Sequence, residues 1–217
     1  MITGPRIPSK TDIAERLVIF LHGYGSNGDD LLGLAPFFQQ VDQAADFVSP
    51  NAIERSPFNA GGFQWFSIPY IDGSSTEEMT RGLMRAHKEL DAFIDNELNM
   101  RGLSEENLVL VGFSQGTMMA LHTAFRRPKP LAGVIGFSGR LLFPELLQGE
   151  ISAKPPVVLI HGEDDDVVPV NDSIEAAKVL KELGVKVKVH LSPRTAHSIA
   201  QDGLQNAIEF YEGVVKG

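Results

Sequence analysis

Short apolar runs alternate with amphipathic stretches along the whole chain. The apolar runs are rich in β-branched residues and predict strands over 17–23, 45–50, 107–113, 131–139, 155–162 and 185–191. The stretches between them have apolar residues at helical spacing and predict helices over 29–41, 76–99, 115–126, 171–184 and 198–214. Continuously apolar strands separated by helices are typical of a parallel sheet covered on both faces. We therefore expect a single α/β domain over residues 1–217, with a mostly parallel central sheet.

The ends of two helices carry capping signals. One helix begins at Thr76, and Met79 rather than Glu stands three residues on, so we expect no full capping box there. In the later helix, Asp172 with Glu175 resembles a capping box, and Gly184 resembles a C-terminal cap.

Charge and composition exclude several classes of protein. The formal net charge is −9, and such an acidic chain disfavours DNA, RNA and anionic lipid as partners. The chain has no cysteine, which excludes disulfides, thiolate metal sites and a cysteine nucleophile. The N-terminal apolar run, 17–21, is too short to span a membrane, and no signal peptide precedes it. We expect a cytoplasmic protein without stable membrane insertion.

A candidate nucleophile follows the strand at 107–113. Gly112-Phe113-Ser114-Gln115-Gly116 matches G-x-S-x-G and stands between that strand and a predicted helix. This strand–turn–helix context is the one that a nucleophile elbow requires, because the strained turn projects the serine hydroxyl over the edge of the sheet. The alternative is a serine that only caps the helix. A second GFS, ending at Ser138, lacks the second glycine and a strong following helix, so we expect a turn residue there.

A serine hydroxyl needs a base to take its proton, and the position of His197 favours it. His197 lies in a loop between the last predicted strand and the last predicted helix. We expect His22 and His161 to be structural, His87 and His122 to lie within helices, and His190 to be exposed on its strand.

The base needs a carboxylate partner, and three consecutive candidates follow the strand at 155–162. In hydrolases with the nucleophile elbow the chain order is Ser, acid, His, so the acid lies between Ser114 and His197. Asp164, Asp165 and Asp166 stand there, and their spacing alone does not choose among them. The alternative is an acidic, solvated turn. Consecutive carboxylates do not match a calcium loop, so we expect no metal site. A serine nucleophile with a base and an acid needs no organic cofactor, so we expect none.

These motifs together resemble the phospholipase/carboxylesterase family, which includes the acyl-protein thioesterases, along nearly the whole chain. The motifs are Leu21-His22-Gly23-Tyr24-Gly25 with Asp29-Asp30, Gln64-Trp65-Phe66, the Ser114 pentapeptide, Phe137-Ser138-Gly139, His161-Gly162 with Val167-Val168-Pro169, and His197. The resemblance implies an α/β-hydrolase fold. It also implies that Asp165 is the acid, with Asp166 in reserve, and that the backbone N–H groups of Tyr24 and Gln115 form the oxyanion hole.

The function implied is hydrolysis of short- to medium-chain carboxylic esters through an acyl-enzyme on Ser114. Thioesterase or lysophospholipase activity is an alternative, and a non-catalytic binding protein on the same fold is another. Dienelactone hydrolases need an elbow cysteine that this chain lacks, and nothing in the sequence supports a peptidase. The family often forms dimers or larger assemblies, so a homo-oligomer stays open.

Residues that contact the substrate are expected in the Pro- and Gly-rich stretch at 50–75, which is long for a loop. Trp65 and Phe66 are the first candidates, and Ile71 and Val167 are weaker ones; ordinary core packing is the alternative for each. Tyr24 and Ser67 differ from the residues frequent in the family, as do Thr117 and Ala196. Tyr24 and Ser67 put the substrate preference in question.

Overall fold

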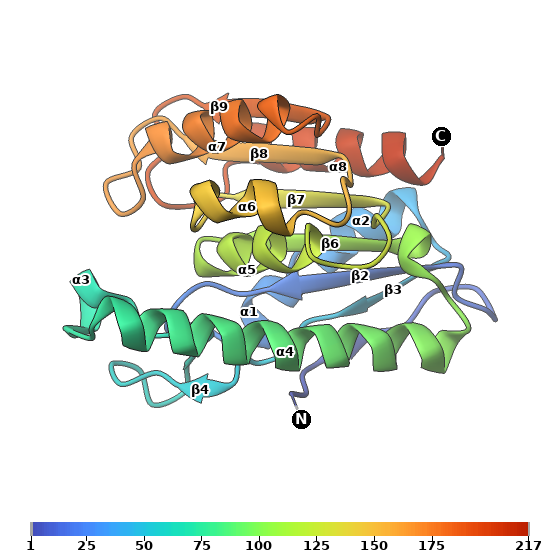
Figure 1. Ribbon diagram of the computed structural model, residues 1–217. Helices are drawn as coiled ribbons and strands as arrows, with labels where there is room; N and C mark the ends of the chain where they lie inside the picture. Colours follow the sequence, from blue (N-terminus) through green and yellow to red (C-terminus); the bar gives the residue numbers. More distant parts are fainter. Residues whose placement is uncertain (1, 217) are drawn as a thin grey trace.

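The computed structural model describes residues 2–216, which form a central sheet of seven strands (Figure 1). In order across the sheet these are β1 (Arg6–Ile7), β3 (Ala45–Val48), β2 (Arg16–Leu21), β6 (Leu108–Phe113), β7 (Gly133–Phe137), β8 (Val157–Gly162) and β9 (Val187–Ser192). Neighbouring strands are parallel except β1 with β3. The expected mostly parallel sheet is confirmed. The short antiparallel edge strand β1 was not predicted, because two residues leave no periodic pattern.

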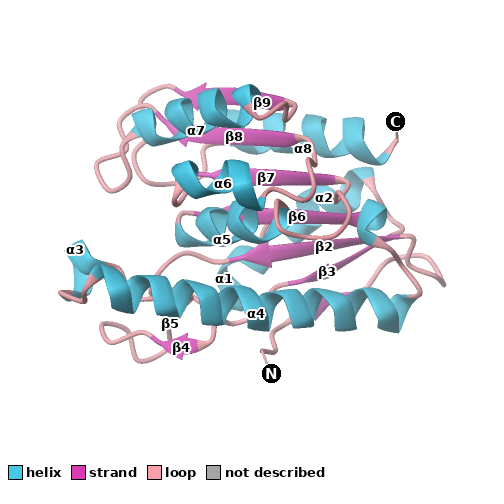
Figure 2. Ribbon diagram, viewed as in Figure 1, coloured by secondary structure: helices cyan, strands magenta, loops and turns pink. Residues whose placement is uncertain are grey.

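Helices cover both faces of the sheet, as the continuously apolar strands predict (Figure 2). Along β2, Leu17, Ile19 and Leu21 pack into one core, whereas Val18 and Phe20 pack into the other. The first core is completed by α4 (Thr76–Arg101), α5 (Gln115–Ala124), α6 (Pro144–Glu150) and α7 (Val170–Glu182). The second is completed by α1 (Gly28–Leu32), α2 (Ala35–Val41) and α8 (Gln201–Val215).

The predicted helix at 29–41 is two helices, so that prediction is wrong in its continuity. The first, α1, ends at Leu32 and the second, α2, starts at Ala35, with Pro36 in its first turn. A proline lacks the N–H that a helix interior needs, but it is tolerated in a first turn. The short helix α6 was not predicted. The other predicted elements are present, with ends displaced by a few residues.

Both capping predictions need correction. The long helix α4 does have a capping box, formed by Ser75 with Glu78, one residue before the predicted pair. The N-cap of α7 is Pro169, which makes no side-chain cap, and Asp172 instead forms an ion pair with Arg140 at 2.8 Å. Gly184 does end α7 in a left-handed conformation, as predicted, with φ of 80°.

The long loop at 50–75 is partly ordered by its own structure. It contains the hairpin of β4 (Glu54–Arg55) with β5 (Phe63–Gln64), the short helix α3 (Pro69–Asp72) and the cap of α4. A 3-10 turn, Glu105–Asn107, leads into β6. Within residues 2–216, every helix is too short or too polar to span a membrane.

Candidate active site

Ser114 lies in a strained turn between β6 and α5. Its backbone has φ of 54° and ψ of −115°, a conformation that L-residues rarely adopt. The turn is possible because glycines flank it: an added Cβ at Gly112 would lie 2.4 Å from Thr117 N, and one at Gly116 would lie 1.7 Å from Leu21 O. The Ser114 N–H donates to Phe137 O at 2.8 Å, which ties the turn to the neighbouring strand. This is the geometry of a nucleophile elbow.

Asp165 and His197 form a hydrogen bond although 32 residues separate them in the chain. His197 Nδ1 lies 2.7 Å from Asp165 Oδ2. The other carboxylate oxygen, Oδ1, accepts from the backbone N–H groups of Val167 at 2.9 Å and Val168 at 2.8 Å. Of the three consecutive aspartates, Asp165 is buried, whereas Asp164 and Asp166 are exposed. The two exposed carboxylates stay solvated, which removes the cost of burying three like charges together.

The electrostatics around Asp165 favour its ionised form. Burial by itself would raise the pKa of this carboxyl group, because it disfavours the charge. The hydrogen bond with His197 and the amides of Val168 and Val167 outweigh the burial, so the pKa of Asp165 is lowered. An ionised carboxylate is the form that can orient an imidazole and stabilise an imidazolium.

The loops that carry Asp165 and His197 are joined through their backbones. Asp164 N donates to Thr195 O at 3.0 Å. An added Cβ at Gly162 would lie 2.2 Å from the same carbonyl oxygen, so only glycine allows this approach. The contact fixes the position of one loop relative to the other.

The ring of His197 lies beside the elbow. Its centroid is 4.8 Å from that of Phe113, the residue before Ser114. In the described part of the chain the Ser114 hydroxyl does not donate a hydrogen bond to His197. Such hydrogen bonds are often long in the free enzyme and tighten when the substrate is bound.

The loop after β2 brings Tyr24 next to the elbow. A Cβ added at the preceding residue, Gly23, would lie 3.5 Å from Ser114 Cβ. Within residues 2–216, the backbone N–H groups of Tyr24 and Gln115 donate to no other group of the chain. Two such free donors near a serine hydroxyl can stabilise an oxyanion. The Tyr24 side chain points elsewhere: its hydroxyl donates to Asp72 at 3.3 Å, and burial, with the Asp72 charge, raises its pKa to about 12.

The side chain of Gln115 has a role that sequence reasoning missed. It is fully buried, its Oε1 accepts from Trp65 N at 2.9 Å, and its Nε2 donates to Phe66 O at 2.7 Å. The amide therefore ties the elbow to the 65–66 segment. The partners lie about 50 residues apart, so no local pattern predicts this contact. The Gln64-Trp65-Phe66 motif, in its place in the chain order, was the only sign of it in the sequence.

The four predicted substrate-contacting residues lie in different surroundings. Trp65 is fully buried and its Nε1 donates to His22 O at 3.0 Å, so it packs behind the site. Phe66 lines a small pocket, whereas Ile71 and Val167 are exposed and do not line it.

The pocket beside the elbow is narrow, with a volume of about 30 Å³. One of its lining residues, Met118, lies one helical turn after Ser114, and its N–H donates to Ser114 O at 3.2 Å. Its walls are mostly apolar and consist of Phe66, Ile68, Tyr70, Met79, Met118, Arg140 and Leu142. An apolar pocket next to a nucleophile can hold the acyl group of an ester.

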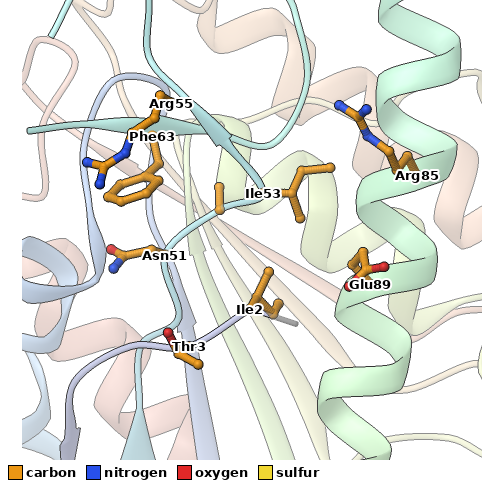
Figure 3. Close-up of a pocket in the computed structure, with 9 residues that line it drawn as sticks. Ile2, Thr3, Asn51, Ile53, Arg55, Phe63, Arg85 and Glu89 are labelled. Atoms are coloured by element: carbon orange, nitrogen blue, oxygen red, sulfur yellow. The ribbon is translucent and has the colours of Figure 1, made fainter. Parts of the chain in front are cut away.

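A separate cavity of about 620 Å³ lies between the N-terminal segment, the β4–β5 region and α4 (Figure 3). None of Ser114, Asp165 and His197 lines it. Two of its wall residues support the Tyr24 loop: Phe63 O accepts from Gly25 N at 2.8 Å, and Asn51 Oδ1 accepts from Gly28 N at 2.8 Å.

The remaining candidates occupy structural positions. Ser138 is buried in a left-handed turn with φ of 45°, as predicted for a turn residue. His22 is buried, and its Nε2 accepts from Ala52 N at 3.0 Å. His190 is half-buried rather than exposed, because it pairs with Asp202 at 2.8 Å. Residues 2–216 contain no group of three or more His, Asp or Glu side chains able to hold a metal ion.

The sheet, the elbow after β6 and the joined loops of Asp165 and His197 are features of a hydrolase of the α/β-hydrolase fold. A family model described as phospholipase/carboxylesterase matches residues 2–215, so the chain belongs to the phospholipase/carboxylesterase family. The predicted family, fold and class of enzyme, a carboxylic ester hydrolase, are thereby confirmed.

Relatives cover nearly the whole chain. Acyl-protein thioesterase 1 of Saccharomyces cerevisiae is 31% identical, over 96% of this chain and 97% of its own. A crystal structure of esterase PE8 superposes with a TM-score of 0.94 at 43% identity, covering 98% and 99% of the two chains. The structure of SOBER1 from Arabidopsis thaliana has a TM-score of 0.80 at 26% identity, covering 93% and 100%.

Proposed function

We propose that the protein hydrolyses short- to medium-chain carboxylic esters by two-step acyl transfer, with Ser114 as nucleophile, His197 as base and Asp165 as the acid that orients His197. The observation that carries the proposal is the hydrogen bond from His197 Nδ1 to the buried Asp165 carboxylate. That bond leaves His197 Nε2 free to act on the serine of the adjacent elbow.

In the first step Ser114 Oγ attacks the ester carbonyl carbon while its proton passes to His197 Nε2. The negative oxygen of the tetrahedral intermediate accepts hydrogen bonds from Tyr24 N–H and Gln115 N–H, each contributing about 3 kcal/mol in the transition state. The protonated His197 then gives its proton to the leaving alcohol, and an acyl-serine remains.

In the second step water attacks the acyl-serine while His197 takes a proton from the water. The carboxylic acid leaves and Ser114 regains its proton. The residues named here carry both steps, with Asp165 ionised throughout.

The pocket beside the elbow supports a limit on acyl length. A volume of about 30 Å³ bounded by Phe66, Met118 and Leu142 leaves no room for a long acyl chain. Of the predicted contacts, Phe66 therefore touches the acyl chain and Trp65 supports it from behind. We assign Ile71 and Val167, both exposed, to contacts with the alcohol part of the ester.

The test is a rate series on p-nitrophenyl esters of increasing acyl length, with Ser114→Ala as the matched variant. We expect the highest rate at short or medium chains, and loss of both turnover and fluorophosphonate labelling in Ser114→Ala. Labelling of the variant at the wild-type rate would refute the nucleophile. A wild-type protein that neither turns over an ester nor takes the label would favour a non-catalytic binding protein.

Thioester hydrolysis is the second candidate, and the likeness to an acyl-protein thioesterase favours it. The same acyl group offered as a p-nitrophenyl ester and as a thioester separates the two activities. A kcat/KM at least tenfold higher for the thioester would move the proposal to the thioesterase class. Preference for a long-chain lysophospholipid would instead support the lysophospholipase alternative.

A further inference from the structure

A second histidine, His161, contacts the carboxylate of Asp165. It is the penultimate residue of β8, and its side chain is fully buried. Its Nε2 lies 3.2 Å from Asp165 Oδ2, the same oxygen that accepts from His197 Nδ1 at 2.7 Å. The carboxylate of Asp165 is therefore placed between two imidazole rings.

The other partners of His161 fix which of its ring nitrogens carries the proton. Nε2 lies 2.8 Å from Val168 O, and a carbonyl oxygen only accepts, so Nε2 must donate. Its N–H therefore donates to Val168 O, and the same nitrogen lies 3.2 Å from Asp165 Oδ2. In the neutral ring Nδ1 then accepts from the hydroxyl of Ser173, 2.7 Å away on α7.

These contacts place the His161 ring across the loop that carries Asp165. The ring joins the start of the loop to Val168 at its end and, through Ser173, to α7. Ser173 Oγ also lies 3.2 Å from Gly139 O, at the end of β7. A Cβ added at Gly139 would lie 3.0 Å from Ser114 O, so the backbone at Gly139 packs closely against the elbow.

We propose that His161 is a positioning residue that sets how strongly Asp165 supports His197 as a base. This inference rests on the proposed function. Val168 O and Ser173 Oγ would satisfy both nitrogens of a histidine that only filled space, and the contact with Asp165 Oδ2 is additional. The positive end of the N–H dipole beside that oxygen partly offsets its negative charge, so the His197 imidazolium is stabilised less.

Removing the N–H group of His161 should move the acid limb of the pH–rate profile in one direction. Without the N–H of His161, more charge on Asp165 Oδ2 faces His197 and its imidazolium becomes more stable. The free base then appears only at higher pH, so the acid limb of kcat/KM moves upward. Other ionisable side chains on the elements around His161 stay the same in each variant; these are Glu163, Asp164, Asp166, His190, Asp202 and the pair of Arg140 with Asp172.

Two substitutions at His161 separate positioning from space filling. In His161→Gln the side-chain amide reaches the place of Nε2 and still puts an N–H group beside Asp165. In His161→Asn the amide is one carbon shorter, reaches only the place of Nδ1 and puts no N–H group beside Asp165. His87→Asn, on α4, is the matched control for loss of a partly buried histidine.

The measurement is kcat/KM for p-nitrophenyl acetate from pH 5 to pH 9, normalised to active sites counted by fluorophosphonate labelling. We expect the acid limb of His161→Asn to move upward by about half a pH unit to one unit. His161→Gln and His87→Asn should keep the wild-type limb. An unmoved limb in His161→Asn, or the same shift in both His161 variants, would overturn the proposal.

A second measurement needs only the wild-type protein, so it tests the proposal even if His161→Asn fails to fold. In protein labelled with ¹⁵N-histidine, NMR should assign the proton of neutral His161 to Nε2. A proton on Nδ1 alone would overturn the proposal, because Nε2 would then carry no N–H group beside Asp165. Failure of the proposed function gives a different result: the wild-type protein hydrolyses no ester, while the NMR test still reports on His161.

Discussion

Asp165 Oδ2 accepts a hydrogen bond from His197 Nδ1 across 2.7 Å, although the two residues come from loops after different strands. The neighbours of Asp165 in the chain, Asp164 and Asp166, are exposed. One carboxylate of three thus meets the histidine, because only its side chain points into the junction of the two loops.

The first prediction separates these aspartates. Asp165→Asn should lower kcat by about 10³- to 10⁴-fold, because the amide neither fixes the His197 ring nor stabilises its charged form. Asp166→Asn, at an exposed position, should stay within about twofold of wild type. Rates per labelled active site check both. A large loss in Asp166→Asn with a small one in Asp165→Asn would reassign the acid.

The second prediction concerns the buried side chain of Gln115. Gln115→Met should lower the free energy of unfolding by about 2–5 kcal/mol, because it leaves the N–H of Trp65 and the carbonyl of Phe66 buried without partners. Urea denaturation measures the change. Gln205→Met, at an exposed position on α8, is the control and should change stability by less than about 0.5 kcal/mol. Equal losses of stability in the two variants would contradict the role of Gln115 in tying the elbow to the 65–66 segment.

The third prediction concerns the pH dependence of stability. Burial, and then the charge of Arg126 and the neighbouring His87, lower the pKa of His122 to about 3. The unfolded chain binds a proton at this histidine below about pH 6.5, whereas the folded chain does not until about pH 3. The free energy of unfolding should therefore fall as the pH is lowered through this window.

His122→Leu should remove that contribution, which amounts to roughly 3 kcal/mol between pH 6.5 and pH 4. At pH 7 the same variant should lose little stability, since neither ring nitrogen of His122 has a hydrogen-bond partner within the described residues. Denaturation at a series of pH values checks the slope. Gln205→Met, at an exposed position, removes no titrating group and should keep the wild-type slope; an unchanged slope in His122→Leu would contradict the prediction.

The fourth prediction tests the acyl pocket. Leu142→Ala should raise the rate on p-nitrophenyl hexanoate relative to acetate by about tenfold, because it widens a pocket whose volume is now about 30 Å³. Leu146→Ala, on the exposed face of α6, removes the same atoms outside the pocket and should leave the ratio unchanged. A ratio that moves equally in both variants would exclude this pocket as the acyl site.

The sequence predicted the layers of the fold well, because the signals are local. Continuous apolar runs such as β6 and β8 are buried on both faces, and burial follows directly from composition. The break between α1 and α2 and the strand β1 were missed, since each depends on one or two residues. The cap of α4 was placed one residue too late, because Ser75 and Thr76 are both plausible caps by type.

For the candidate site, too, the sequence predicts what depends on neighbouring residues and misses what depends on distant ones. The strained turn at Ser114 follows from neighbouring glycines, so its five-residue motif carries the information in the sequence. The fit of Gln115 to Trp65 and Phe66, and that of His161 to Asp165, depend on side chains that meet only in the folded protein.

The sequence by itself determined the parallel sheet, its two helical layers and the elbow that presents Ser114, because hydrophobic period and glycine placement act over a few residues. The tertiary structure decided which aspartate meets His197, which amide clamps the elbow and which side chains border the small pocket. Those choices depend on hydrogen bonds and contacts between distant loops. Such contacts need positions set to within a few tenths of an ångström, which only the packed sheet supplies.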